Sequence, residues 1–131
     1  MLKLHLIAML SFLLLLAASS FSQHMNEQDS PCLNAASTVN SVKCLSKARV
    51  SSDAKLNSFY QEIQKRLDGD DAKRLIADEK LWIQYRDANC EAEQALYGLG
   101  AGAEPAYLAC LEAMTRERTK ELRIKYTLTL K

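Results

Sequence analysis

The apolar residues of this chain recur every three or four positions from about residue 38 onward, which is the spacing of amphipathic α-helices. Glycine and proline interrupt this pattern in two places, at Gly69 and within the stretch 98–105. The pattern therefore predicts helices over about 38–67, 71–97 and 105–125, and it shows no convincing strand. The side chains expected to face inward are Val39, Val42, Leu45, Leu56, Phe59, Tyr60, Ile63, Leu67, Leu75, Trp82, Tyr85, Ala92, Leu96, Tyr107, Leu111, Met114 and Leu122.

The residues at the predicted helix ends agree with these limits. Ser37 or Thr38 can cap the first helix, and Gly69 suits the left-handed position beyond its end. The acidic pair at 70–71 favours the start of the second helix through capping and the helix dipole. Pro105 is well placed in the first turn of the third helix.

These elements predict an all-α fold: a small disulfide-stabilised three-helix bundle built on a long antiparallel helical hairpin, with the third helix packed back against it. The segment 51–53, Ser-Ser-Asp, is expected to bend the first helix. The tail 126–131 alternates like a strand but has no partner, so it is expected to fray. A chain of 131 residues has room for one domain.

The first 22 residues follow a different pattern. Residues 1–3 carry a positive charge, residues 4–18 are almost wholly apolar, and Ser20-Phe21-Ser22 ends the run with small residues. This pattern is typical of a secretory signal peptide, with cleavage expected after Ser22 or, as a second choice, after Ser20. The alternative, an uncleaved membrane anchor, needs about 20 apolar residues, and this run is shorter. The sequence thus predicts an exported protein, periplasmic or secreted, whose mature domain spans 23–131 and keeps no stable membrane anchor.

Removing the leader leaves a mature chain without net charge. The full sequence has 17 basic and 16 acidic residues, and Lys3 is the only charged residue of the leader, so 16 of each sign remain. A dedicated nucleic-acid binder carries a basic excess, so no nucleic-acid partner is expected. Because long-range steering by net charge is weak, a partner must be recognised through a local patch.

The four cysteines of the mature chain are expected to form disulfides, because export brings them into an oxidising compartment. A zinc site of four thiolates is the alternative, but such sites usually need closely spaced pairs, and the nearest two cysteines are twelve residues apart. Cys90 and Cys110 lie about two turns before and after the glycine-rich loop, so a hairpin brings them level. The favoured pairs are Cys90–Cys110 and Cys32–Cys44; Cys44 also comes level with Cys90 and Cys110, which leaves other pairings open.

The side chains that catalysis would need are scarce. His5 lies in the leader and His24 in the expected flexible start of the mature chain, so no base remains in the globular part for a Ser-His-Asp or Cys-His arrangement. Neighbouring acids such as Asp78 and Glu79 point to different faces of a helix, which does not suit glycoside hydrolysis. The glycine cluster follows a helix rather than a strand, unlike a phosphate-binding loop. The sequence predicts no enzyme, no catalytic residue, no cofactor and no metal.

Three motifs carry a family resemblance. Residues 56–60 read L-N-x-x-Y, residues 82–90 read W-x-x-Y-R-D-x-x-C, and residues 110–122 read C-x4-T-x-x-R-x3-L. Together they resemble the LprI-like lysozyme inhibitor N-terminal domain family over about residues 32–122. The resemblance implies a small exported helical domain, often bacterial, whose protein partner is a lysozyme that it inhibits. This chain departs from the family in lacking a lipid-attachment cysteine and in having Glu79 where relatives usually have glutamine. The motif residues are Leu56, Asn57, Tyr60, Trp82, Tyr85, Arg86, Asp87, Thr115, Arg118 and Leu122.

The same motif residues also have a structural interpretation. Arg118 lies at helical spacing from Met114 and Leu122, so it is expected to point inward, where it needs an acidic partner. The candidate partners are Asp78, Glu79 and Asp87. We expect Arg86, Asp87 and Arg118 to form a polar network that fixes the register of the helices. The other basic residues near the end of the third helix are expected to form an ordinary solvated face: Arg116, Lys120, Arg123 and Lys125.

The sequence predicts a helical protein-binding module. An inhibitor of a muramidase must occupy a cleft that contains two carboxyl groups. A loop held rigid by Cys90–Cys110 would lose little entropy on binding, so it is the expected contact. The alternatives are a structural or assembly factor of the bacterial envelope without effect on lysozyme, and an adaptor whose helices dock a partner helix, which an exposed row of large apolar residues would favour. The expected contact residues are Leu99, Gly100, Ala101, Gly102, Ala103 and Glu104.

Overall fold

The computed structural model describes residues 24–131, and these residues form three long α-helices, one short 3-10 turn and no strand. The expected leader at 1–22 lies outside them. The elements are η1 (His24–Asn26), α2 (Thr38–Gln64), α3 (Gly69–Ala95) and α4 (Ala103–Lys125). The predicted all-α helical bundle is confirmed.

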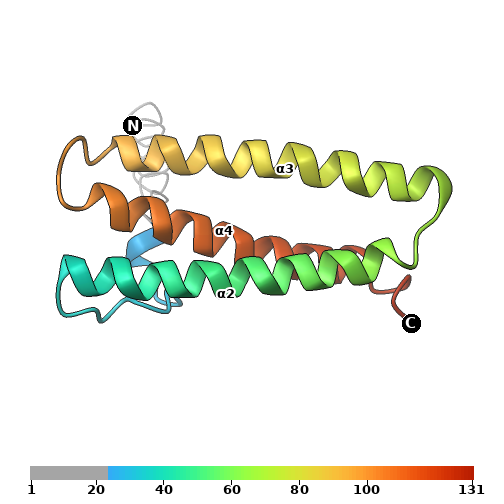
Figure 1. The fold of residues 1–131 in the computed structure, drawn as a ribbon, viewed down its shortest axis with the longest axis horizontal. Coiled ribbons are helices and arrows are strands. Elements are labelled where there is room, and N and C mark those ends of the chain that lie inside the picture. Colours follow the sequence, from blue (N-terminus) through green and yellow to red (C-terminus); the bar gives the residue numbers. More distant parts are fainter. Residues whose placement is uncertain (1–23) are drawn as a thin grey trace, which may run out of the picture.

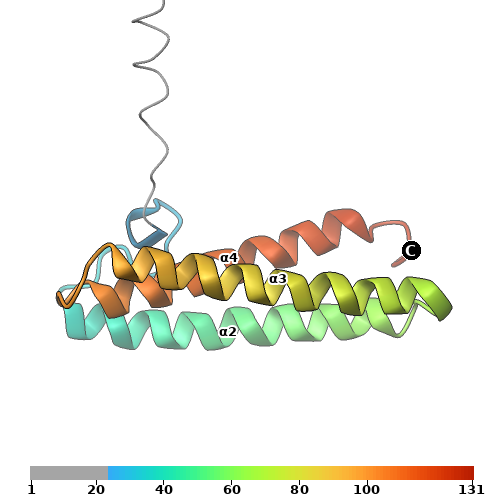
Figure 2. The ribbon, with the colours of Figure 1, turned by 90° about the horizontal axis from the view of Figure 1, so that it is seen from above.

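The helix α4 holds the bundle together. Figure 1 shows α2 and α3 running antiparallel, with α4 parallel to α2. Extensive contacts join α4 to both α2 and α3, whereas α2 and α3 make little direct contact with each other. Seen from above in Figure 2, α4 leaves the plane of the other two helices toward its C-terminal end. The hairpin predicted from the sequence is therefore closed by the third helix rather than by direct packing of the first two.

The helix ends have local causes. Ser37 caps α2, because its hydroxyl accepts a hydrogen bond of 3.2 Å from the backbone N–H of Asn40. Gly69 and Gly98 have φ angles of +50° and +54°, and each reverses the chain between two helices. The helix α4 begins at Ala103, two residues earlier than predicted, since a proline at 105 is tolerated in a first turn whose N–H groups need no helical partner.

Two local predictions were wrong. The helix α2 runs unbroken through 51–53, where a bend was expected, because Ser52 is buried and its hydroxyl donates to Glu112 of α4. The tail after α4 does not fray. It forms turns in which Tyr126 and Leu130 pack against the core, and Nη1 of Arg66 donates to the carbonyl of Leu130 at 3.2 Å.

The core is narrow and divided into three clusters along α4. At the C-terminal end of α4, Leu122 meets buried leucine, isoleucine and phenylalanine side chains of α2 and α3. In the N-terminal half of α4, Ala109 packs with Leu45 and Cys32, and a third cluster surrounds Cys90 and Cys110. The buried members of the first cluster are Leu56, Phe59, Ile63, Leu75 and Leu122.

Several side chains expected to face inward are exposed. On α3, Tyr85 is 63% exposed and Ala92 is exposed as well, and Leu96, directly after the end of α3, is 71% exposed. The reason is that α3 packs mainly against α4, so only a narrow stripe of its surface has a neighbour. Val39, in the first turn of α2, is 62% exposed.

Two disulfides join the chain at its loop-rich end. The structure bonds Cys32 to Cys44 and Cys90 to Cys110, with Cα–Cα distances of 5.9 and 5.4 Å. These are the two pairs that the sequence favoured. Across residues 24–131, no helix combines the length and the hydropathy needed to cross a membrane.

Candidate functional site

Arg118 occupies a nearly dry position between α3 and α4. It is 3% exposed, and its guanidinium donates to Asp78 at 2.7 Å, Glu79 at 3.0 Å and Glu121 at 2.9 Å. Burial by itself would lower the pKa of Arg118, but hydrogen bonds to these three carboxylates outweigh it and raise the pKa. Glu79, the residue that departs from the family pattern, thus serves as a partner of the buried charge.

Trp82 connects Arg118 to a second arginine. The guanidinium carbons of Arg86 and Arg118 lie 5.2 and 5.5 Å from the centroid of the indole ring, which is cation–π distance. Asp87 accepts hydrogen bonds of 2.9 and 2.7 Å from Arg86, not from Arg118 as the sequence allowed. Arg86 also reaches Thr115 of α4, at 3.4 Å. The two arginines therefore belong to separate ion-pair groups that meet at Trp82.

This arrangement places the motif residues in two groups. Leu56 and Leu122 are buried in the core, Tyr60 packs against it, and Thr115 is fully buried. Asn57 and Tyr85 are exposed and stand outside the network. Every charge of the buried group is paired, so the network is suited to holding α3 and α4 in register rather than to proton transfer.

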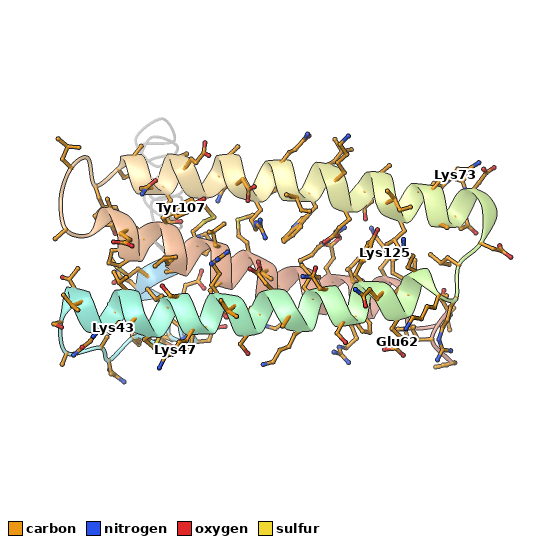
Figure 3. The ribbon with its side chains drawn as sticks, viewed as in Figure 1. Lys43, Lys47, Glu62, Lys73, Tyr107 and Lys125 are labelled. Atoms are coloured by element: carbon orange, nitrogen blue, oxygen red, sulfur yellow. A yellow bond between two sulfur atoms is a disulfide. The ribbon has the colours of Figure 1, made fainter. Side chains whose placement is uncertain are left out.

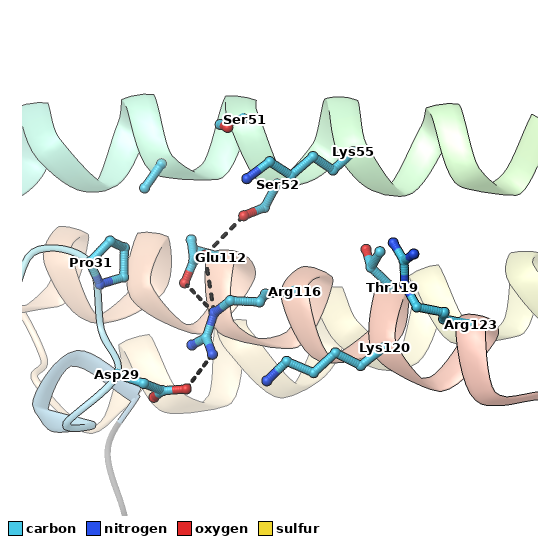
Figure 4. Close-up of a pocket in the computed structure, with 11 residues that line it drawn as sticks. Asp29, Pro31, Ser51, Ser52, Lys55, Glu112, Arg116, Thr119, Lys120 and Arg123 are labelled. Carbon is cyan, nitrogen blue, oxygen red and sulfur yellow. Dashed lines mark hydrogen bonds and ion pairs between the residues drawn. The ribbon is translucent and has the colours of Figure 1, made fainter.

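A groove of about 410 Å³ lies between α2 and α4 (Figure 4). At its floor, Ser52 donates to Glu112 at 2.9 Å, and Nε of Arg116 donates to Glu112 at 3.3 Å. Arg116 also pairs with Asp29, and this hydrogen bond lowers the pKa of that exposed carboxyl. The groove continues past Lys55 into a second one of about 880 Å³.

The sequence interpretation missed this groove. Arg116, Lys120 and Arg123 were expected on an ordinary solvated face, but all three line the groove, and the side chain of Arg116 is only 23% exposed. The signal that could have revealed the site is Ser52, a small polar residue in the buried stripe of α2.

His24 belongs to the folded body, contrary to the expectation of a flexible start. Its backbone N–H donates to Glu93 Oε1 at 2.9 Å, and its Nδ1 lies 2.5 Å from Glu93 Oε2. A histidine therefore does lie in the folded body, and the prediction that none does was wrong. The sulfur of Cys110 lies close to this pair and would be the third ligand of a metal ion, but it is bonded to Cys90 in a disulfide. The pair thus anchors the N-terminal segment to α3.

The loop between α3 and α4 is short and built of hydrogen-bonded turns. Hydrogen bonds of 2.9 Å from Gly100 N–H to the carbonyl of Tyr97 and of 3.1 Å from Ala103 N–H to Gly100 form successive turns. Leu99 is fully exposed at the tip. Of the expected contact residues, Gly100 and Ala101 are exposed beside it, whereas Ala103 and Glu104 belong to the first turn of α4 and not to the loop.

Comparison with known proteins identifies the family. A search of curated proteins and a search of solved structures found no match. The family model described as "Lysozyme inhibitor LprI" matches residues 32–122, which span all three long helices and both disulfides. That match covers more than half of the chain, and the chain belongs to the LprI lysozyme inhibitor family.

Proposed function

We propose that this protein inhibits a lysozyme-type muramidase by inserting the loop after α3 into the catalytic cleft. Membership of an inhibitor family supports the activity. The observation that carries the choice of surface is Leu99, a fully exposed leucine at the tip of an end held by a disulfide. A concave cleft requires an accessible partner surface, and this loop lies at one end of the bundle (Figure 1).

The loop is preorganised for such a contact. Cys90 and Cys110 join α3 to α4, and the glycines around the tip let the backbone turn tightly. A Cβ added at Gly102 would lie 2.6 Å from the ring of Tyr97, so this ring covers the base of the loop closely. A loop that is already ordered loses little entropy when it binds, and more of its contact energy appears as affinity.

The decisive variant is Leu99→Asp. A muramidase cleft contains two carboxyl groups, so an acidic tip meets like charge and also loses its apolar contact. We expect at least a tenfold weaker inhibition in a lysis assay with several lysozyme types. Leu128→Asp is the matched control, because Leu128 is 82% exposed near the other end of the bundle. If the Leu99 variant inhibits as strongly as the parent, the loop is not the contact surface. If the parent itself inhibits no lysozyme, the proposed function is refuted.

We also propose that the chain acts after export and loses residues 1–22. The apolar run and the small residues at 20–22 support this, together with the membership of an inhibitor family. The mass of the protein recovered from the periplasm or medium should correspond to a chain that begins at Gln23. An intact Met1 in the exported material would contradict it.

A second candidate function, docking of a partner helix in a structural or assembly role, is favoured by the outer face of α3. Leu81 and Tyr85 are 66% and 63% exposed there, and Leu96, directly after the end of the helix, is 71% exposed. Exposed apolar rows of this kind mark protein contacts. The parent protein separates the two functions, because a docking factor of this kind inhibits no lysozyme. If the parent does inhibit, the double variant Leu81→Gln/Tyr85→Gln shows which surface is used: inhibition is retained if the loop is the contact, and it is lost if α3 is.

A further inference from the structure

We infer that the groove between α2 and α4 is a binding site for an extended, carboxylate-rich peptide segment. The groove is defined by two adjoining hollows that share Ser51, Lys55, Thr119 and Arg123. This inference is independent of muramidase inhibition, because the groove lies on a different part of the molecule from the loop after α3.

The acidic side chains of the groove have ion-pair partners, whereas some of its basic side chains have none in the part of the chain that the structure describes. On its floor, Glu112 and Asp29 share a single arginine, Arg116, so one negative charge remains there. Along its walls, Lys55 and Arg123 form no ion pair with any carboxylate of residues 24–131, and Lys120 has one pair, with Glu117 at 2.6 Å. The two hollows together are lined by five basic side chains and three acidic ones, so the lining as a whole carries an excess of positive charge that would attract an anionic ligand. The basic side chains are Lys55, Arg116, Lys120, Arg123 and Lys131, and the acidic ones are Asp29, Glu62 and Glu112.

The guanidinium of Arg123 is positioned by a contact with an aromatic ring. Its guanidinium carbon lies 4.7 Å from the centroid of the Phe59 ring, so the ring occupies one face of the guanidinium. The N–H groups lie at the edge of a guanidinium, and stacking leaves them free to donate to a carboxylate in the bidentate manner. Figure 4 shows Arg123 extending from α4 toward α2, on the wall opposite Lys55.

The shape of the groove favours a peptide. Its α2 wall runs from Ala48 to Glu62, which corresponds to about 21 Å at 1.5 Å per residue. An extended peptide of about six residues spans that length. Hydroxyl groups of Ser51, Ser58 and Thr119 can bond to peptide groups, and Pro31 and Ala48 add apolar surface in the first hollow. Phe59, the aromatic ring of the lining, is buried beneath Arg123, so it offers no open face on which a sugar could stack.

The test is fluorescence anisotropy with a fluorescein-labelled decapeptide of alternating glutamate and alanine, added to the disulfide-bonded protein. We expect saturable binding that weakens as salt is raised. The variant Lys55→Gln/Arg123→Gln should weaken it at least tenfold, and Lys55→Gln/Lys120→Gln should weaken it as well. The second variant leaves the contact between Arg123 and Phe59 intact, so its effect cannot come from lost packing. Circular dichroism melting verifies that both variants are folded.

The matched control is Lys43→Gln/Lys47→Gln, which removes the same charge from the outer side of α2 (Figure 3). Its affinity for the peptide should stay within twofold of the parent. Equal weakening by the control would reduce the effect to net charge and overturn the site. Binding of polyphosphate as tight as that of the peptide, with the same dependence on Lys55 and Arg123, would overturn the choice of a peptide. Failure of the parent to bind the peptide at low salt would overturn the inference altogether.

Discussion

Arg118 shows how a single charged residue can be stable in a nearly dry position. The three carboxylates around it come from both α3 and α4, so the same bonds that satisfy the guanidinium also fix the two helices against each other. Trp82 adds a ring contact on the same group. The charge therefore sets the register of the helices while the neighbouring leucines supply the apolar burial.

Replacing Arg118 by alanine should destabilise the protein by about 3 kcal/mol, because the buried end of Glu79 would lose its partner and a cavity would remain. Water already screens Asp78 and Glu121, whose side chains are 40% and 52% exposed, so the loss stays at the lower end for a buried ion pair. Urea unfolding measures it. Arg74→Ala, which breaks an exposed pair with Asp71, should change the free energy of unfolding by less than about 0.5 kcal/mol. Equal values for the two variants would show that Arg118 has no special role.

At the scale of single residues, the sequence predicted the inward arginine but not all of its partners. Helical spacing places Arg118 on the buried face of α4, and the antiparallel packing expected of α3 and α4 brings Asp78 and Glu79 near it. It cannot show that Asp87 turns toward Arg86, because that choice depends on the rotation of α3 about its axis. The contact of His24 with Glu93 joins residues 69 positions apart, and no local pattern predicts it.

At the scale of elements, helix positions were predictable and helix faces were only partly so. Ser37, Gly69 and Gly98 determine where the chain enters and leaves helices, and their effects are local. The apolar period on α3 includes Tyr85 and Leu96 because they lie at helical spacing from true core residues. Which part of an apolar stripe is buried depends on how many neighbours the helix has, and α3 packs mainly against α4.

The disulfide that joins α3 to α4 gives a prediction at the scale of elements. Replacing Cys90 and Cys110 with serine should lower the free energy of unfolding by about 3 kcal/mol, because the cross-link closes a loop between residues 20 positions apart in the unfolded chain. The measurement is thermal or urea unfolding of the double variant beside the parent. The Leu99 loop should also become more susceptible to proteolysis. A variant as stable as the parent, with an equally resistant loop, would remove the basis for a preorganised contact.

At the scale of the whole molecule, acid should weaken the fold. Burial would raise the pKa of Asp78, but hydrogen bonds to Arg118 and Lys125 outweigh it, so the pKa is lower in the folded protein than in the unfolded chain. The folded state then holds fewer protons, and the stabilisation is present above the unfolded value of about 3.9. It is lost as the pH falls through the lower folded value.

Urea unfolding between pH 6 and pH 2 should therefore show the free energy of unfolding falling below about pH 4. In Asp78→Asn the loss over this range should be smaller, because one of the titrating groups is absent. Identical pH profiles for the parent and the variant would show that Asp78 carries none of the acid sensitivity.

The central position of α4 also bears on the order in which the molecule can assemble. Since α2 and α3 make little contact without α4, the last long helix of the sequence is the one that completes every core cluster. A chain that emerges from a ribosome or a translocation pore N-terminus first would hold its first two helices unburied until residues 103–125 follow. No stably folded intermediate would then form that could block passage through a narrow channel. For the same reason, a chain truncated at Gly102 should show no cooperative melting transition.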